Sequence, residues 1–195
     1  MAPFLAPVEK PKGLLLRAVY FFTRKQFGKV STPIAVFSAR MPNAFLSFYG
    51  KVSRLDKKLE LSPHTAVLLR QQVAAINGCA FCMDTSRWYA TKKSPEDVAR
   101  IDALPGYRSS PLFSDAERAA LDYAIEVTAT KRVDGETFAR LAGHYSEREI
   151  CDIVWLVASE HVYNMTNHAL NIGSDGLCEI PDRRARTSTP VHAAG

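Results

Sequence analysis

Apolar residues return every three or four positions along most of this chain, which is the period of an amphipathic helix. The clearest run is Ala66, Leu69, Val73 and Ile76. No stretch alternates apolar and polar residues for long enough to predict a strand. The pattern therefore predicts an all-α protein, with helices near 13–28, 33–40, 43–56, 63–77, 79–92, 95–103, 115–130, 135–144 and 147–172.

Helix start signals agree with this periodicity. Ser114 with Glu117, and Ser146 with Glu149, have the spacing of capping boxes, in which each side chain satisfies a free backbone donor of the other residue. A capping residue directly before a proline also favours a helix start, because proline suits the first helical position. Such pairs begin at Thr32, Ser62 and Ser94.

The predicted helices leave no interior linker long enough to separate two domains. We divide the chain into an N-terminal extension with one helix (1–30), a helical domain (31–182) and a basic tail that we expect to be mobile (183–195). Residues 1–11 lie before the first predicted helix, and we expect them to be mobile as well.

The first predicted helix is apolar around much of its circumference. Such a surface needs covering, and a chain of 195 residues has little other structure to cover it. We therefore expect a homo-oligomer, which the sequence leaves open as a dimer, trimer or hexamer. The residues concerned are Leu14, Leu15, Leu16, Val19, Phe21 and Phe22.

The formal net charge is +5, and the excess lies near the two ends of the chain. Solvated basic ends explain this better than nucleic-acid binding, because no zinc-finger spacing or aromatic RNA-binding signature accompanies the charge. An anionic partner remains the alternative. The longest apolar runs fall far short of the ~20 residues that span a membrane, and no secretory signal precedes the first helix. We expect a cytoplasmic protein that binds neither nucleic acid nor membrane.

The strongest chemical signal is the pair Cys79 and Cys82, which directly follows Asn77 and Gly78. Glycine can take the left-handed conformation that ends one helix, so the pair falls at the start of the next. Free N–H groups and the helix dipole favour a thiolate there, and the three-residue step brings both sulfurs within reach of a disulfide. Redox chemistry is favoured over two inert core cysteines.

A metal site would need two further ligands besides this pair. Cys151 and Cys178 do not have metal-binding spacing, so we expect neither metal nor cofactor. Cys151 lies among apolar residues and is predicted to be buried, while Cys178 follows the last helix and receives no role.

The segment 75–84 (AINGCAFCMD) resembles the core motif of the carboxymuconolactone decarboxylase superfamily, in its AhpD-like alkylhydroperoxidase branch. The helix start at 113–121 and the segment 159–172 are similar to later parts of the same family, so that the resemblance covers about residues 25–177. It implies an AhpD-like helical bundle of about eight or nine helices, with thiol peroxidase or disulfide-reductase activity.

In peroxidases of that family the second cysteine attacks the peroxide and the first resolves the product. By this resemblance Cys82 would be the attacking residue and Cys79 the resolving one, with a hydroperoxide as substrate and an external dithiol as reductant. Lactone decarboxylases of the superfamily generally lack the pair, which argues against decarboxylation here.

The chain departs from the peroxidase pattern at the two residues of the family's proton relay. Ser86 stands in place of the histidine, and Val67 in place of the glutamate. A serine hydroxyl can donate a hydrogen bond to a thiolate but is no base near neutral pH. The sequence therefore predicts weak peroxidase activity.

One possible replacement for the relay lies on the last predicted helix, where the apolar stripe of Ile153 and Val157 continues into Glu160. Burying a carboxylate is costly unless it is paired, so the position indicates either a structural tie or an acid–base group facing Cys82. The polar face continues through Asn164 and Asn167 and is flanked by two histidines, of which His168 is the further relay candidate.

These observations leave three functional hypotheses. The first is a thiol-dependent oxidoreductase that reduces hydroperoxides through a Cys79–Cys82 dithiol. The second is a lactone decarboxylase-type enzyme of the same fold. The third is a non-catalytic oligomer that senses redox state or binds a partner.

Overall fold

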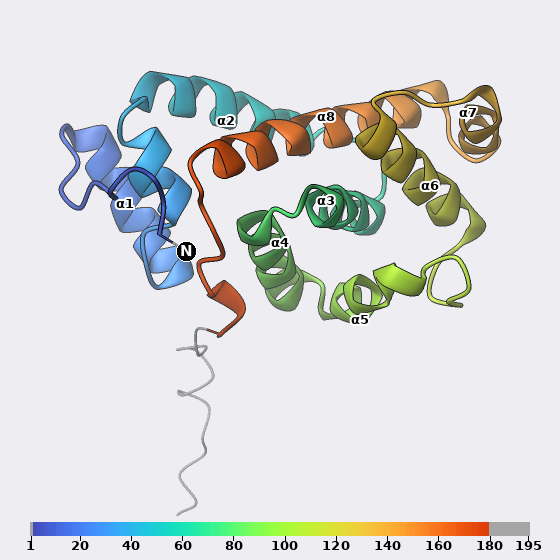
Figure 1. Cartoon of the computed structure of the whole chain (residues 1–195), viewed down its shortest axis with the longest axis horizontal. Helices are drawn as coiled ribbons and strands as arrows, with labels where there is room; N and C mark the ends of the chain where they lie inside the picture. Colours follow the sequence, from blue (N-terminus) through green and yellow to red (C-terminus); the bar gives the residue numbers. More distant parts are fainter. Residues whose placement is uncertain (1, 180–195) are drawn as a thin grey trace, which may run out of the picture.

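The computed structural model describes residues 2–179, and within them the chain forms helices and no strands. Figure 1 shows the arrangement of the helices. The eight α-helices are α1 (Leu14–Phe27), α2 (Pro42–Asp56), α3 (Pro63–Asn77), α4 (Ala80–Lys93), α5 (Pro95–Ala103), α6 (Asp115–Thr130), α7 (Gly135–Ala142) and α8 (Glu147–Ala169). The prediction of an all-α bundle is therefore confirmed.

Side-chain caps or an initial proline explain where most of these helices begin. Ser114 and Ser146 form complete capping boxes with Glu117 and Glu149 at the starts of α6 and α8. Asp134 accepts a hydrogen bond from the backbone N–H of Thr137 and caps α7. Prolines open α2, α3 and α5, although no side chain caps these three helices.

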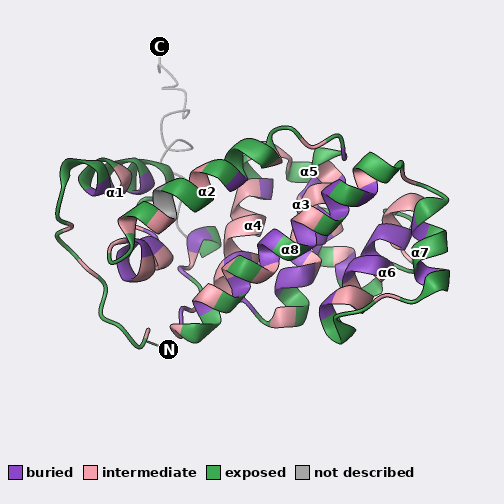
Figure 2. Cartoon of the chain, turned by 90° about the horizontal axis from the view of Figure 1, so that it is seen from above, coloured by how far each residue is buried: buried purple, intermediate pink, exposed green. Residues whose placement is uncertain are grey.

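Helix α3 is the centre of the fold. It packs against α8, α6, α4 and α5, and its apolar face contributes the fully buried Leu68, Leu69 and Val73 to the main core. Figure 2 shows buried residues concentrated on α3, α6 and α8, whereas the outer side of α1 is exposed. The helices that meet α3 thus bring together side chains that are far apart in the sequence.

Helix α1 stands at one end of the molecule and is tied to the segment that follows α8 (Figure 1). The carboxylate of Asp175 accepts hydrogen bonds from the backbone N–H and the hydroxyl of Thr32 and forms an ion pair with Lys29. One face of α1 remains uncovered, with Leu14 at 82% exposure and Phe21 and Phe22 at 63% each. Homo-oligomerisation remains a prediction that this face supports.

Two sequence expectations need correction. The helix expected at 33–40 is a short π-helical turn, Ile34–Ser38. Residues 2–11 were expected to be mobile, but the backbone N–H of Phe4 donates to Leu170 and that of Val8 donates to Ala35. These contacts attach the segment to the rest of the protein. The basic tail at 183–195 lies outside the described residues.

Candidate active site

The cysteine pair lies at the junction of α3 and α4. Gly78 has a left-handed backbone (φ 70°) that ends α3, and Cys79 is the N-cap residue of α4. The backbone N–H of Cys82 donates to the Cys79 sulfur at 3.4 Å, and the two cysteines are joined by a disulfide. Both cysteines are buried, with Cys79 1% exposed and Cys82 8% exposed.

Amide groups of α8 surround the two sulfurs. The side-chain amide of Asn164 donates to the Cys82 sulfur at 3.1 Å. The amide of Asn167 lies 3.4 Å from the Cys82 sulfur and 3.5 Å from the Cys79 sulfur. Both asparagines are buried, and both follow from the polar face that the sequence indicates on this helix. Hydrogen-bond donors in this position favour a thiolate when the disulfide is reduced.

Glu160 points inward and joins this network through Asn164. The carboxylate is 6% exposed and accepts a hydrogen bond of 2.8 Å from the Asn164 amide. Burial raises the pKa of Glu160, and the nearby Arg70 guanidinium, 3.2 Å away, opposes that rise only in part. The structure shows no hydrogen bond between Glu160 and either sulfur, so Asn164 is the link between them.

Arg70 and Asp56 are the charged residues nearest to Glu160 in this network, and no sequence pattern indicates a role for either one. The Arg70 guanidinium also forms an ion pair of 2.9 Å with Asp56, whose other oxygen accepts a hydrogen bond from the Trp155 indole. These three residues come from α3, α2 and α8, and only the folded arrangement brings them together. The buried carboxylate thus has the partner that its burial requires.

A second branch of the network runs through Asn77 at the end of α3. Its amide donates to the Asn164 carbonyl at 2.8 Å and lies 3.3 Å from Nδ1 of His161. Burial, assisted by the positive charge of Lys131, lowers the pKa of His161. This histidine is therefore neutral near pH 7 and can accept the hydrogen bond from Asn77.

The remaining sequence candidates lie away from the sulfurs or make no hydrogen bond to them. Ser86 is half-buried one turn after Cys82, and no side-chain hydrogen bond joins it to either sulfur in the described part of the chain. Val67 is half-buried against the main apolar core. His168 is exposed on α8.

The expectation for Cys151 is wrong, because this residue is exposed. Its apolar neighbours in the sequence include Val154, which is also on the outer side of α8 and is 45% exposed. Cys178 is exposed as well, and its thiol donates to the backbone carbonyl of Asp84.

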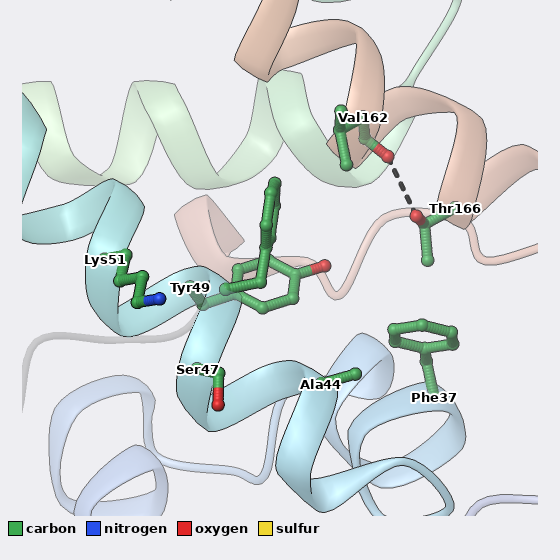
Figure 3. Close-up of a pocket in the computed structure, with 8 residues that line it drawn as sticks. Phe37, Ala44, Ser47, Tyr49, Lys51, Val162 and Thr166 are labelled. Carbon is green, nitrogen blue, oxygen red and sulfur yellow. Dashed lines mark hydrogen bonds between the residues drawn. The ribbon is translucent and has the colours of Figure 1, made fainter.

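An apolar hollow of about 490 Å³ lies beside the site, between α2 and the second half of α8. Figure 3 shows Tyr49 at its centre, with Phe37, Val162 and Thr166 around it and Ser47 and Lys51 on α2. The Tyr49 ring lies 5.1 Å from the ring of Tyr163, centre to centre. Tyr163 in turn packs against the buried cluster that contains both cysteines.

Among residues 2–179 no group of three or more His, Cys, Asp and Glu side chains is placed to hold a metal ion. The same part of the chain has no helix with the length and apolar character of a membrane span.

The sequence is 33% identical to YnjA, an uncharacterized protein of Escherichia coli (strain K12), over 175 residues that cover 88% of this chain and 94% of YnjA. The chain belongs to the same family as YnjA. No family model matches the sequence.

Two solved structures share the fold of this chain. The debrominase Bmp8 superposes with a TM-score of 0.76 over 90% of this chain and 94% of Bmp8, at 19% identity. A peroxidase-related protein of Ralstonia eutropha JMP134, described as an alkylhydroperoxidase AhpD core, superposes with a TM-score of 0.71 over 91% of this chain and 96% of its own, at 20% identity. The AhpD-like fold expected from the sequence is therefore confirmed.

Proposed function

We propose that this protein is a thiol-dependent oxidoreductase that reduces organic hydroperoxides through the Cys79–Cys82 pair. The observation that best supports the proposal is that the side-chain amides of Asn164 and Asn167 donate hydrogen bonds to sulfur at the N-terminus of α4. A structural disulfide has no need of such donors, whereas a thiolate gains from each of them.

The proposed cycle uses two steps and an external dithiol. The Cys82 thiolate attacks the terminal oxygen of R–O–O–H, breaks the O–O bond and becomes a sulfenic acid, while the leaving alkoxide takes up a proton and departs as R–OH. The Cys79 thiol then attacks the Cys82 sulfur, and the disulfide forms with release of water. A dithiol carrier reduces the disulfide and is itself oxidised.

Cys82 is the attacking residue in this proposal because it is the more exposed residue of the pair and its sulfur accepts the 3.1 Å hydrogen bond from Asn164. Cys79 is almost fully buried and lies at the N-cap, where it can reach only its neighbour. The division of roles agrees with the one that the family resemblance implies.

Glu160 acts in the proposal through Asn164. An amide does not pass protons as a carboxyl or imidazole does, so the Glu160–Asn164 contact holds the Asn164 N–H in line with Cys82. The ion pair with Arg70 offsets the charge of the Glu160 carboxylate near the thiolate. We assign Glu160 as a positioning residue, and Ser86 and His168 have no part in this step.

The test is peroxide consumption by the reduced protein with a dithiol such as dithiothreitol as the reductant. Wild type should consume cumene hydroperoxide and Cys82→Ser should not. Cys79→Ser, reduced and then freed of dithiol before one equivalent of peroxide is added, should react once and stop at the Cys82 sulfenic acid, which dimedone traps. Equal consumption by wild type and Cys82→Ser would refute the proposal.

A second candidate is reductive dehalogenation of a small aromatic compound. It is favoured by the fold similarity to the debrominase Bmp8, of which one variant was solved with 2,3,4-tribromopyrrole, and by the aromatic hollow beside the cysteines. In that case the Cys82 thiolate would take bromine from the ring as a sulfenyl bromide, the ring would gain a proton, and Cys79 would displace bromide to close the disulfide. Bromide release from a brominated pyrrole distinguishes this reaction from peroxide reduction.

A further inference from the structure

One side chain, Tyr163, contacts both the lining of the hollow between α2 and α8 and the buried cluster that contains the disulfide. Tyr163 is three residues before Thr166, which lines the hollow, and four residues before Asn167, which contacts both sulfurs. Residues three and four apart are neighbours on a helix surface, so Tyr163 lies between the two faces of α8. The half-buried Tyr163 packs on the cluster that contains the cysteine pair and lies next to the residues that line the hollow.

Contact between two tyrosine rings connects the hollow to the cysteine site. Tyr49 lines the hollow and stacks on Tyr163 at a tilt of 33°, and Tyr163 packs on the Cys79–Cys82 cluster. Figure 3 shows the Tyr49 ring reaching from α2 into the space between the two helices. A molecule resting on Tyr49 would therefore lie one ring away from Cys82.

The residues that line the hollow indicate which class of molecule it binds. Its walls are mainly aromatic and aliphatic, and its volume of about 490 Å³ falls within the ~300–1,000 Å³ of small-molecule sites. Hydrogen peroxide would gain nothing from such walls, whereas an organic hydroperoxide would bury its apolar body there. On the α2 side the hollow has the polar residues Ser47 and Lys51. On the α8 side it has Val162 and Thr166, whose hydroxyl donates to the Val162 carbonyl.

We infer that this hollow binds the apolar body of an organic hydroperoxide and that Tyr49 and Tyr163 guide its peroxide end to Cys82. The inference rests on the proposed function and deepens it by naming the residues that determine substrate preference. It predicts a preference for cumene hydroperoxide over hydrogen peroxide that comes from the hollow and not from the sulfur chemistry, since both peroxides offer the same O–O bond to Cys82.

The experiment compares two charge substitutions on exposed apolar residues of α8. Val162→Asp places a carboxylate in the hollow, where Val162 is 43% exposed. Met165→Asp introduces the same charge on the same helix at a position that is 69% exposed and does not line the hollow. Because both residues are substantially exposed, neither change disturbs the core.

Two measurements are made on each protein: kcat/KM for cumene hydroperoxide and for hydrogen peroxide, and the Kd of cumyl alcohol, the product, for the oxidised protein by calorimetry. Val162→Asp should lower kcat/KM for cumene hydroperoxide and weaken cumyl alcohol binding, each by about tenfold, because even small changes in an apolar pocket have effects of that order. The ratio of its kcat/KM for cumene hydroperoxide to that for hydrogen peroxide should therefore fall, and Met165→Asp, outside the hollow, should match wild type throughout.

The outcomes separate this inference from the proposed function. If the two variants behave alike, or if wild type does not bind cumyl alcohol, the hollow is not the substrate site. Another outcome is that wild type binds cumyl alcohol and Val162→Asp abolishes that binding, while wild type consumes neither peroxide. In that case the hollow is a binding site, but the proposed peroxide reduction is wrong.

Discussion

Replacing Asn164 tests whether its amide stabilises the Cys82 thiolate. Asn164→Leu keeps a similar side-chain volume and removes the N–H that lies 3.1 Å from the sulfur. A hydrogen bond to a charged group contributes about 1.5–3 kcal/mol, and one pKa unit corresponds to about 1.36 kcal/mol. The pKa of the Cys82 thiol should therefore rise by about 1–2 units, and the thiolate fraction near pH 7 should fall by about tenfold to a hundredfold.

The assay requires Cys82 as the only thiol. Of the four cysteines, Cys79, Cys151 and Cys178 are changed to serine, and the pH dependence of iodoacetamide alkylation then reports the pKa of Cys82 alone. Met165→Leu, on the same helix and exposed, is the control. Circular dichroism must first show that each variant is folded.

Asn164→Leu also leaves the Glu160 carboxylate and the Asn77 amide each short of a partner, at a cost of about 1–3 kcal/mol apiece. If this variant does not fold, Asn164→Asp keeps the size of the side chain and places a carboxyl group beside the sulfur, which should also raise the thiol pKa. An unchanged Cys82 pKa in a folded variant of either kind would refute the assigned role of Asn164.

Three further predictions concern Glu160, Asp84 and the two positions of the family's proton relay. Burial raises the pKa of Glu160, so the folded protein keeps the carboxyl proton to higher pH than the unfolded chain does. The stability that this proton contributes is fully present below the unfolded pKa of about 4.3 and declines as the pH rises through the folded pKa. Urea unfolding of Glu160→Gln across this range should lack the decline. Burial alone would raise the pKa of Asp84, but hydrogen bonds from Leu177, Ser174 and Cys178 hold that pKa below the ordinary value of about 3.9. The ionised Asp84 therefore stabilises the folded state above that value, and this stabilisation is lost as the pH falls through the lower folded pKa. Asp84→Asn should increase hydrogen exchange at the Leu177 and Cys178 amides near pH 7, while exchange in α3 stays unchanged. Restoring the family relay by Ser86→His with Val67→Glu should raise the peroxidase rate, by at most the ~10²–10⁴-fold that general acid–base catalysis provides, and an unchanged rate in a folded double variant would show that the relay has no place in this protein.

Those parts of the structure that depend on local sequence could be predicted from it. Capping boxes and the three- to four-residue period act within one helix, and they placed α6 and α8 correctly at their starts. The position of Cys79 at a helix N-terminus likewise follows from Gly78, whose left-handed backbone ends the preceding helix. The inward orientation of Glu160 follows from the apolar stripe that precedes it on α8.

The features that could not be predicted from the sequence depend on contacts between segments that are far apart along the chain. Arg70 and Asp56 lie on separate helices, and nothing in either local sequence shows that they meet at Glu160. Cys151 was misplaced because α8 has apolar residues on its exposed side as well as its buried side, so apolar neighbours did not indicate burial. The hollow and the Tyr49–Tyr163 contact arise from the packing of α2 on α8 and have no sequence signature.

The most direct test of the account is a thiol count on the reduced wild-type protein before and after one equivalent of cumene hydroperoxide, followed by peptide mapping. The four free thiols should fall to two, with Cys79 linked to Cys82 and with Cys151 and Cys178 still reduced. An unchanged thiol count, or oxidation confined to Cys151 and Cys178, would contradict the claim that this pair is the site of peroxide reduction.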